Sequence, residues 1–159
     1  MEFKGKYNFL SNFALCPVTY EGMLFPTVEH AYQAAKTRNW DERERVRKAR
    51  SAGDAKRLGK RVTLRADWDQ QKLHVMDVLL HQKFAVEPFR SALLETGNDE
   101  IVHDNWWHDT YWGMCAGVGE NHLGKLIMAI RHKLTAPAEW RAGSPPPLGS
   151  WIAAGEPKK

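Results

Sequence analysis

The fold class is decided by residues 67–86, which read DWDQQKLHVMDVLLHQKFAV. Apolar side chains recur in this stretch at the spacing of one α-helical face: Leu73, Val75, Met76, Leu79, Leu80 and Phe84. Such a face must be buried against other elements to be stable in water. The pattern therefore predicts a long helix packed on a core, and it favours a mainly helical protein.

Shorter elements are expected on both sides of this helix. A hairpin is predicted at 18–25 around Glu21-Gly22, and Thr27 is suited to cap a helix that continues to Lys36. The remaining expectations are a helix from a cap at Asp41 to Arg50, helices at 53–59, 88–97 and 120–134, a short strand at 100–103 and an irregular loop at 104–119. Together they predict a single domain, mainly α with a minor β component in the form of a short N-terminal hairpin.

The length of 159 residues fits one domain with its own core. Five of the eight prolines follow Leu134, so we expect a domain at 1–134 and an irregular Pro/Gly-rich tail at 135–159. The sequence shows neither a membrane-spanning apolar run nor a signal-peptide core. Its two cysteines, Cys16 and Cys115, form no disulfide pattern, which favours a reducing cytoplasm.

Positive charge is concentrated in residues 41–65, which carry a net charge of +6, whereas the rest of the chain carries −2. One interpretation is a surface for a phosphate-bearing partner, either a nucleotide or a nucleic acid. The other is a solvated helical face laced with ion pairs such as Glu44 with Lys48. The sequence leaves both open.

Polar residues of the helix after Thr27 are candidates for chemistry. Glu29, Gln33 and Lys36 are spaced to lie along one helical face. Glu29 falls in the first turn, where the helix dipole favours the ionised form expected of a general base. The alternative is that Glu29 only completes the helix cap. A histidine such as His30 is more often a satisfied core or surface residue.

The loop at 104–119 is rich in aromatic residues and glycine. Trp112 lies beside Gly113, where an exposed ring would stack on a base, and Trp106-Trp107 either do the same or pack in the core. Gly117 and Gly119 precede a helix start that could present backbone N–H groups to a phosphate, although Glu120 opposes this. Histidines are scattered without metal-ligand spacing, so no metal site is expected.

Five motifs in order along the chain resemble the NADAR, or YbiA-like, family. They are Ser11-Asn12-Phe13, Pro26-Thr27-Val28-Glu29-His30-Ala31-Tyr32-Gln33-Ala34-Ala35-Lys36, Gln82-Lys83-Phe84, Asp109-x-x-Trp112-Gly113 and Gly119-Glu120-Asn121-x-Leu123-Gly124-Lys125. The resemblance spans roughly residues 9–134 and implies a single-domain YbiA-like fold. It also implies a hydrolase with N-glycosidase activity and no cofactor.

The implied substrates are phosphorylated ribosyl or ADP-ribosyl compounds. Some family members are associated with ribosylamine intermediates of early riboflavin synthesis, and others resemble enzymes that remove ADP-ribose from guanine, also in nucleic acid. Two rival functions remain: a non-catalytic module that binds NAD or ADP-ribose, and a nucleic-acid binder that uses residues 41–65.

By resemblance, Glu29 and Asp109 are the catalytic carboxylates. The implied substrate-binding residues are Asn12, Phe13, His30, Gln33, Lys36, Trp68, Lys83, Trp112, Gly113, Gly119 and Asn121. We expect Lys36, Lys83 and the helix start near Asn121 to neutralise phosphate, and Trp112 or Trp68 to stack on the base.

Overall fold

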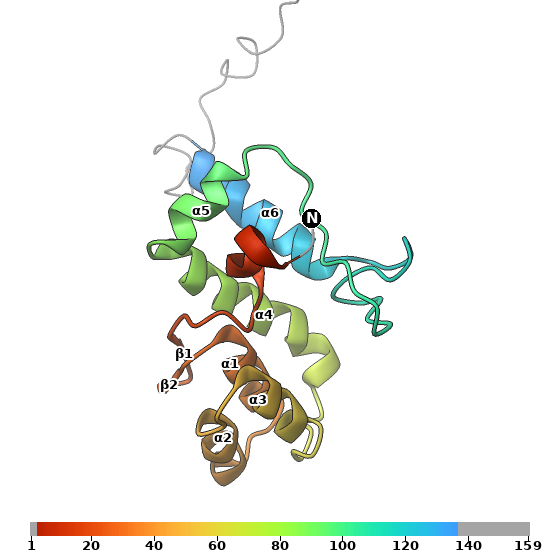
Figure 1. The fold of residues 1–159 in the computed structure, drawn as a ribbon. Helices are drawn as coiled ribbons and strands as arrows, with labels where there is room; N and C mark the ends of the chain where they lie inside the picture. Colours follow the sequence, from red (N-terminus) through yellow and green to blue (C-terminus); the bar gives the residue numbers. More distant parts are fainter. Residues whose placement is uncertain (1–2, 137–159) are drawn as a thin grey trace, which may run out of the picture.

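The computed structural model describes residues 3–136. One long helix, α4 (Trp68–Ala85), crosses the middle of the molecule (Figure 1). The helices α1 (Val28–Ala35), α2 (Trp40–Arg47) and α3 (Ala52–Gly59) lie on one side of it, and α5 (Phe89–Glu95) and α6 (His122–Thr135) lie on the other. A short 3-10 helix, η1 (Gly5–Leu10), precedes the hairpin and matches no element of the sequence prediction.

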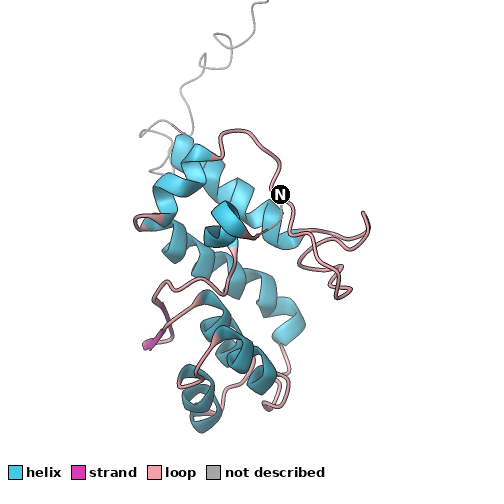
Figure 2. Ribbon diagram, in the orientation of Figure 1, coloured by secondary structure: helices cyan, strands magenta, loops and turns pink. Residues whose placement is uncertain are grey.

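Within residues 3–136, the strands are confined to the predicted hairpin. Strands β1 (Val18–Tyr20) and β2 (Met23–Phe25) pair antiparallel, with Val18 opposite Phe25, and the rest of the regular structure is helical (Figure 2). The mainly helical fold with a minor β component is therefore confirmed. Within residues 3–136, no helix combines the length and the apolar character needed to cross a membrane.

The core lies along α4 as its apolar face predicts. Met76, Leu79, Leu80 and Phe84 are buried, whereas Leu73, predicted on the same face, is 37% exposed. The apolar face of α6 also reaches the core through Leu123, Ile127 and Ile130.

Four predicted helix limits differ from the structure by two or three residues, among them the end of α5, which lies at Glu95 instead of at 97. Helix α2 is capped by Asn39, whose side-chain oxygen accepts the Glu42 N–H, rather than by Asp41, and it ends at Arg47. Helix α6 starts at His122 instead of at 120.

The strand predicted at 100–103 does not form. Its backbone groups bond instead to α6 and to Asn121, the residue before α6. The Ile101 N–H donates to Met128 Sδ. The Asn121 side-chain amide donates to Ile101 C=O and accepts the His103 N–H. The loop at 104–119 is irregular as predicted, with only isolated bridges. Residues 137–159 of the predicted tail lie outside the described residues. Helix α6 ends at Thr135, the first residue assigned to that tail.

Candidate active site

A cavity of about 440 Å³ opens between α1, the segment after η1 and the 104–119 loop. Seven of its lining residues were predicted from the sequence: Asn12, Phe13, Glu29, Gln33, Lys36, Asp109 and Trp112. Both predicted catalytic carboxylates therefore lie in the wall of one cavity. The other lining residues are Ser11, Tyr32, Lys56, Met76, His103, Trp107 and Leu123.

Helix α1 forms one wall of this cavity. Thr27 caps the helix by accepting the His30 N–H, as predicted, and the Glu29 N–H donates to Asn12 C=O. Glu29 and Gln33 are one turn apart and face the cavity, and Lys36 follows just past the helix end. The predicted common face is therefore present, and it is joined to the segment that carries Asn12.

Glu29 is almost fully buried, and this burial shifts the pKa of its carboxyl. Burial raises the pKa of its carboxyl and so opposes ionisation; the Gln33 amide and the ammonium groups of Lys56 and Lys36 act in the other direction. The helix start is therefore not the main influence on Glu29, because desolvation has the largest effect on its pKa. A carboxylate with a raised pKa is a stronger base than an exposed one.

The hydrogen bond from Gln33 to Glu29 depends on a close approach to α3. Gln33 Nε2 donates to Glu29 Oε1 at 2.7 Å. The same side chain packs on Gly59, where a methyl group would lie 2.7 Å from Gln33 Cδ and 2.9 Å from its Cβ. Gly59 therefore leaves the space in which the Gln33 amide reaches Glu29.

We expect Gly59→Ala to raise the pKa of Glu29 further. The added methyl group displaces the Gln33 amide, and the carboxylate then loses a donor that favours its charged form. Carbon-13 NMR titration of the glutamate carboxyls measures this shift. Gly53→Ala in the same helix is the control, because its methyl group would meet only Ser51 Oγ at 3.7 Å. Identical Glu29 titrations in both variants would contradict this coupling.

Asp109 is fixed by its own loop. Its Oδ1 accepts the Trp112 N–H at 2.9 Å, and its backbone N–H and C=O both bond to the Asn105 side chain. The charge of Asp109 raises the pKa of both Glu29 and His103, although burial dominates each of these shifts. Asp109 is thus placed close enough to influence the two ionisable groups electrostatically.

Two lysines bring positive charge to the cavity. The Nζ of Lys36 lies 5.6 Å from the centre of the Tyr32 ring, and that of Lys56 lies 5.6 Å from the Trp107 ring. Burial lowers the pKa of Lys36, the Glu29 carboxylate raises it, and Lys56 and Lys60 lower it. This wall of the cavity is suited to an anion such as phosphate.

Three polar atoms of cavity-lining residues are buried without a hydrogen-bond partner in residues 3–136. Gln33 Oε1 is one of them and lies against Gly59 of α3, and the other two are Asn12 Oδ1 and His103 Nδ1. Burial lowers the pKa of His103, so the neutral ring is favoured. Unpaired buried polar atoms are costly, and they commonly mark positions that a ligand completes. Asn12 Oδ1 and His103 Nδ1 are suited to bind hydroxyl groups.

A model of the NADAR domain family matches residues 2–135. The chain belongs to the NADAR family. The Escherichia coli protein named N-glycosidase YbiA is 36% identical over 132 residues, which cover 80% of this chain and 82% of that protein. An N-glycosidase of Nostoc punctiforme is 34% identical over 135 residues, which cover 80% and 86%.

A longer relative and a solved structure match as well. A riboflavin biosynthesis protein of Vibrio vulnificus is 34% identical over 132 residues, and this match covers 36% of its length. The NMR structure of E. coli YbiA superposes with a TM-score of 0.74 at 35% identity, covering 84% of this chain and 83% of that chain. The resemblance to the NADAR family and the YbiA-like fold are therefore confirmed.

Trp68 and His30 do not line the cavity of this NADAR domain. Trp68 is buried behind it, 5.1 Å from the Tyr32 ring, and Tyr32 in turn meets Trp112 edge-on at 5.6 Å. His30 bonds to Thr27 Oγ1 and Ala49 C=O. Trp68 therefore supports the aromatic wall from behind, and His30 ties α1 to the turn after α2.

Lys83 also lies behind the cavity wall. It is fully buried, and its ammonium donates to Ser11 C=O at 2.7 Å. Burial lowers its pKa to about 7. This position does not favour the expected contact between Lys83 and a phosphate. Lys83 instead holds the segment that carries Ser11 and Asn12.

The start of α6 was expected to bind phosphate, but its N–H groups are already engaged. Those of residues 120–123 donate to C=O groups of residues 110–113 in the active-site loop. Gly113 and Gly119 serve this same contact: a methyl group on Gly119 would lie 2.9 Å from Met114 Cα. Gly113, Gly119 and Asn121 therefore shape the loop and do not line the cavity.

Several lining residues had no place in the sequence-based set. Tyr32 follows Glu29 by three positions, so helical spacing would have found it. Ser11 belongs to the Ser11-Asn12-Phe13 motif and Lys56 to the basic stretch 41–65. Nothing in the sequence indicated that either residue would line the cavity. Met76, His103 and Leu123 come from segments that only the tertiary fold brings together. Trp106 and Trp107 are both exposed, so the core-packing interpretation is wrong for them.

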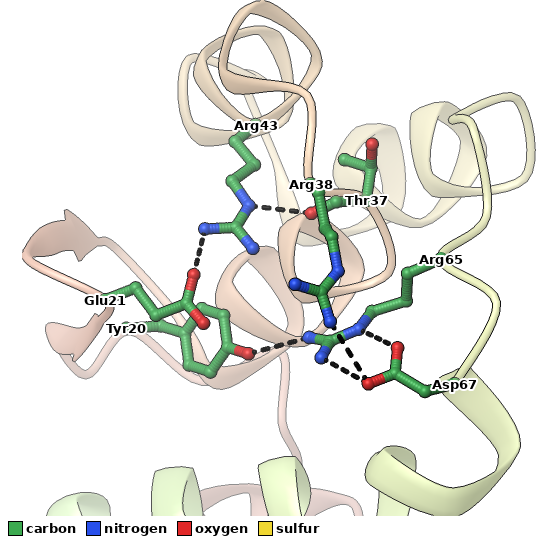
Figure 3. A network of polar contacts seen from close by, with 7 residues as sticks. All are labelled: Tyr20, Glu21, Thr37, Arg38, Arg43, Arg65 and Asp67. Atoms are coloured by element: carbon green, nitrogen blue, oxygen red, sulfur yellow. Dashed lines mark hydrogen bonds and ion pairs between the residues drawn. The ribbon is translucent and has the colours of Figure 1, made fainter.

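A polar network outside the cavity fixes the chain at the end of α1 (Figure 3). Arg43 is buried and donates to Thr37 C=O and to Glu21. Arg65 donates to Asp67 and Tyr20, and its backbone N–H meets Lys36 C=O at 2.8 Å. The network therefore holds the backbone at Lys36 and joins it to the hairpin.

Proposed function

We propose that this protein hydrolyses the N-glycosidic bond of a phosphorylated ribosyl or ADP-ribosyl compound. The class of reaction follows from the family: the chain is a hydrolase of N-glycosyl compounds, like its relatives that are named N-glycosidases. The observation that carries the substrate proposal is the joint presence of Glu29, Asp109 and two lysines in one aromatic-walled cavity.

The carboxylates are assigned to the reacting centre. Cleavage of an N-glycosidic bond develops positive charge on the sugar ring, and a nearby carboxylate stabilises such a state. In the proposed step a water oxygen bonds to the anomeric carbon, and the electrons of the C–N bond leave with the nitrogen. Glu29 accepts the water proton and passes it to that nitrogen, while Asp109 orients the water or a ribose hydroxyl.

The remaining walls are assigned to binding. Lys36 and Lys56 supply charge for a phosphate, and Trp112 and Trp107 offer ring surfaces for a base. Asn12 Oδ1 and His103 Nδ1 are available to ribose hydroxyls. Within residues 3–136, no group of His, Cys, Asp and Glu gathers as a metal site would require, and the proposed step uses none.

A substrate panel tests this function. We expect one or both of two reactions. A pyrimidine ribosylamine phosphate should give the free pyrimidine amine and an equimolar amount of ribose phosphate, and ADP-ribosylated guanosine should give guanosine and an equimolar amount of ADP-ribose. Chromatography of both products measures it, and Glu29→Gln protein purified in parallel controls for a contaminating hydrolase. Tight binding of ADP-ribose in calorimetry without cleavage of any of these compounds would instead support the non-catalytic binding module.

A further inference from the structure

A second hollow, the α2–α3 groove, is separate from the candidate active site. It has a volume of about 660 Å³ and shares no lining residue with the catalytic cavity. Its lining consists of Arg45, Lys48, Ala49, Arg50, Asp54, Arg57, Leu58 and Arg61. Five of these eight residues are cationic and one is acidic, so the groove is strongly positive.

The fold divides the basic residues of 41–65 among different tasks. Arg43 and Arg65 belong to the structural network of Figure 3. Arg47 pairs with Glu44, and Lys56 lines the catalytic cavity. The stretch is therefore not one uniform solvated face, because a distinct subset of its cations meets in the groove.

The carboxylates near the groove are already committed. Asp54 pairs with Arg57, and Glu44 pairs with both Arg47 and Lys48. Glu42 accepts hydrogen bonds from Thr37 and Thr63. In the described part of the chain, Arg45, Arg50 and Arg61 form no ion pair, although the charge of Arg45 helps to lower the pKa of Glu42. All three arginines are exposed. Their charge is available to an external anion.

We propose that the α2–α3 groove binds the phosphodiester backbone of a single-stranded nucleic acid. Arginine forks match phosphate oxygens, and four of the five groove cations are arginines. Helices of eight residues are about 12 Å long, so the groove has room for a few phosphates of one strand.

The position of α3 favours a nucleic acid over an acidic peptide. Lys56 faces the catalytic cavity, and the next residue, Arg57, lines the groove. The groove and the cavity suited to a phosphorylated riboside therefore share α3, a helix about 10 Å across, as a common wall. This choice of partner rests on the proposed function, whereas the charge of the groove does not.

Anisotropy of a labelled twelve-nucleotide oligothymidylate, titrated with the full chain, tests the proposal. If about three phosphates are neutralised, affinity should fall about 20-fold between 50 and 200 mM KCl. The variant Arg45→Ala/Arg50→Ala/Arg61→Ala should bind at least about tenfold more weakly at 50 mM KCl. Its slope of log affinity against log salt concentration should be shallower by about two. Because these side chains are exposed and unpaired, the variant should fold normally, which circular dichroism checks.

The matched control removes three charges elsewhere. Arg90→Ala/Lys125→Ala/Lys133→Ala changes α5 and α6, and it should leave affinity within about threefold of the parent, since distant surface charges contribute little. Equal loss in both variants, or no binding by the parent chain, overturns the proposal. So does equally effective displacement of the strand by polyglutamate, which would identify an acidic-peptide site. Binding is measured without turnover, so failure of hydrolysis does not affect the outcome.

Discussion

Replacing Glu29 with glutamine should lower kcat/KM about 10³-fold on the substrate that the panel identifies. Glutamine preserves the volume of the side chain but neither accepts a proton nor carries the charge that stabilises a cationic sugar. In the wild type, burial raises the pKa of Glu29, so activity should increase as the pH rises through that value. The variant should retain only a small activity without this increase. A pH series of kcat/KM for both proteins measures the effect.

The same substitution should not destabilise the fold. A carboxyl whose pKa is raised on folding binds its proton more tightly in the folded state, so stability falls as the pH rises from the unfolded pKa to the folded one. Glutamine has no such penalty, and thermal unfolding of Glu29→Gln at neutral pH should occur at the same temperature as in the wild type or higher. A folded Glu29→Gln protein with full turnover would remove Glu29 from the mechanism.

Replacing Gly113 with alanine should affect both stability and activity. The methyl group would lie 2.7 Å from Asn105 Nδ2 and 2.8 Å from the His103 ring, and it would also overlap the His103 carbonyl oxygen. The backbone at this contact is held by the Met114 N–H to His103 C=O bond, so it has little freedom to move away. Overpacking of this kind costs about 2–3 kcal/mol.

The expected result is a melting temperature lower by about 4–12 °C, with reduced turnover because Asp109 and Trp112 lie in the displaced loop. Differential scanning calorimetry and the product assay measure the two effects. Gly53→Ala serves as control, since its methyl group is unobstructed and alanine favours the helix. Equal melting temperatures for the two variants would show that the loop adapts to a side chain at position 113.

Sequence rules predicted the parts of the site that one element carries. Helical spacing placed Glu29, Gln33 and Lys36 on one face, and the Thr27 cap fixed where that face begins. Nothing local indicated the depth of burial. Glu29 and Lys83 therefore received ordinary ionised roles, whereas their surroundings lower the preference for charge in both.

The second half of the site depends on contacts between distant segments. His103 is held at the cavity by a hydrogen bond from its backbone N–H to the side-chain oxygen of Asn121. The two residues are 18 positions apart, so their pairing leaves no periodic pattern in the sequence. Asn121 also bonds to Ile101 C=O, so its side chain satisfies backbone groups of residues 100–103, which were predicted to form a strand. Residues such as Asn121 and Gly113 carry family motifs for a structural reason, so a motif alone does not separate binding from support.

The contact between α6 and the active-site loop has a consequence for how substrate range can change. Four consecutive N–H groups, from residues 120–123, hold C=O groups of residues 110–113, and main-chain bonds do not depend on which side chains the loop carries. Trp106, Trp107 and His108 are exposed on the same loop, ahead of Asp109. Random replacement at these three positions should therefore yield proteins with altered leaving-group preference and an unmoved carboxylate, which makes this tip the natural place to begin directed evolution.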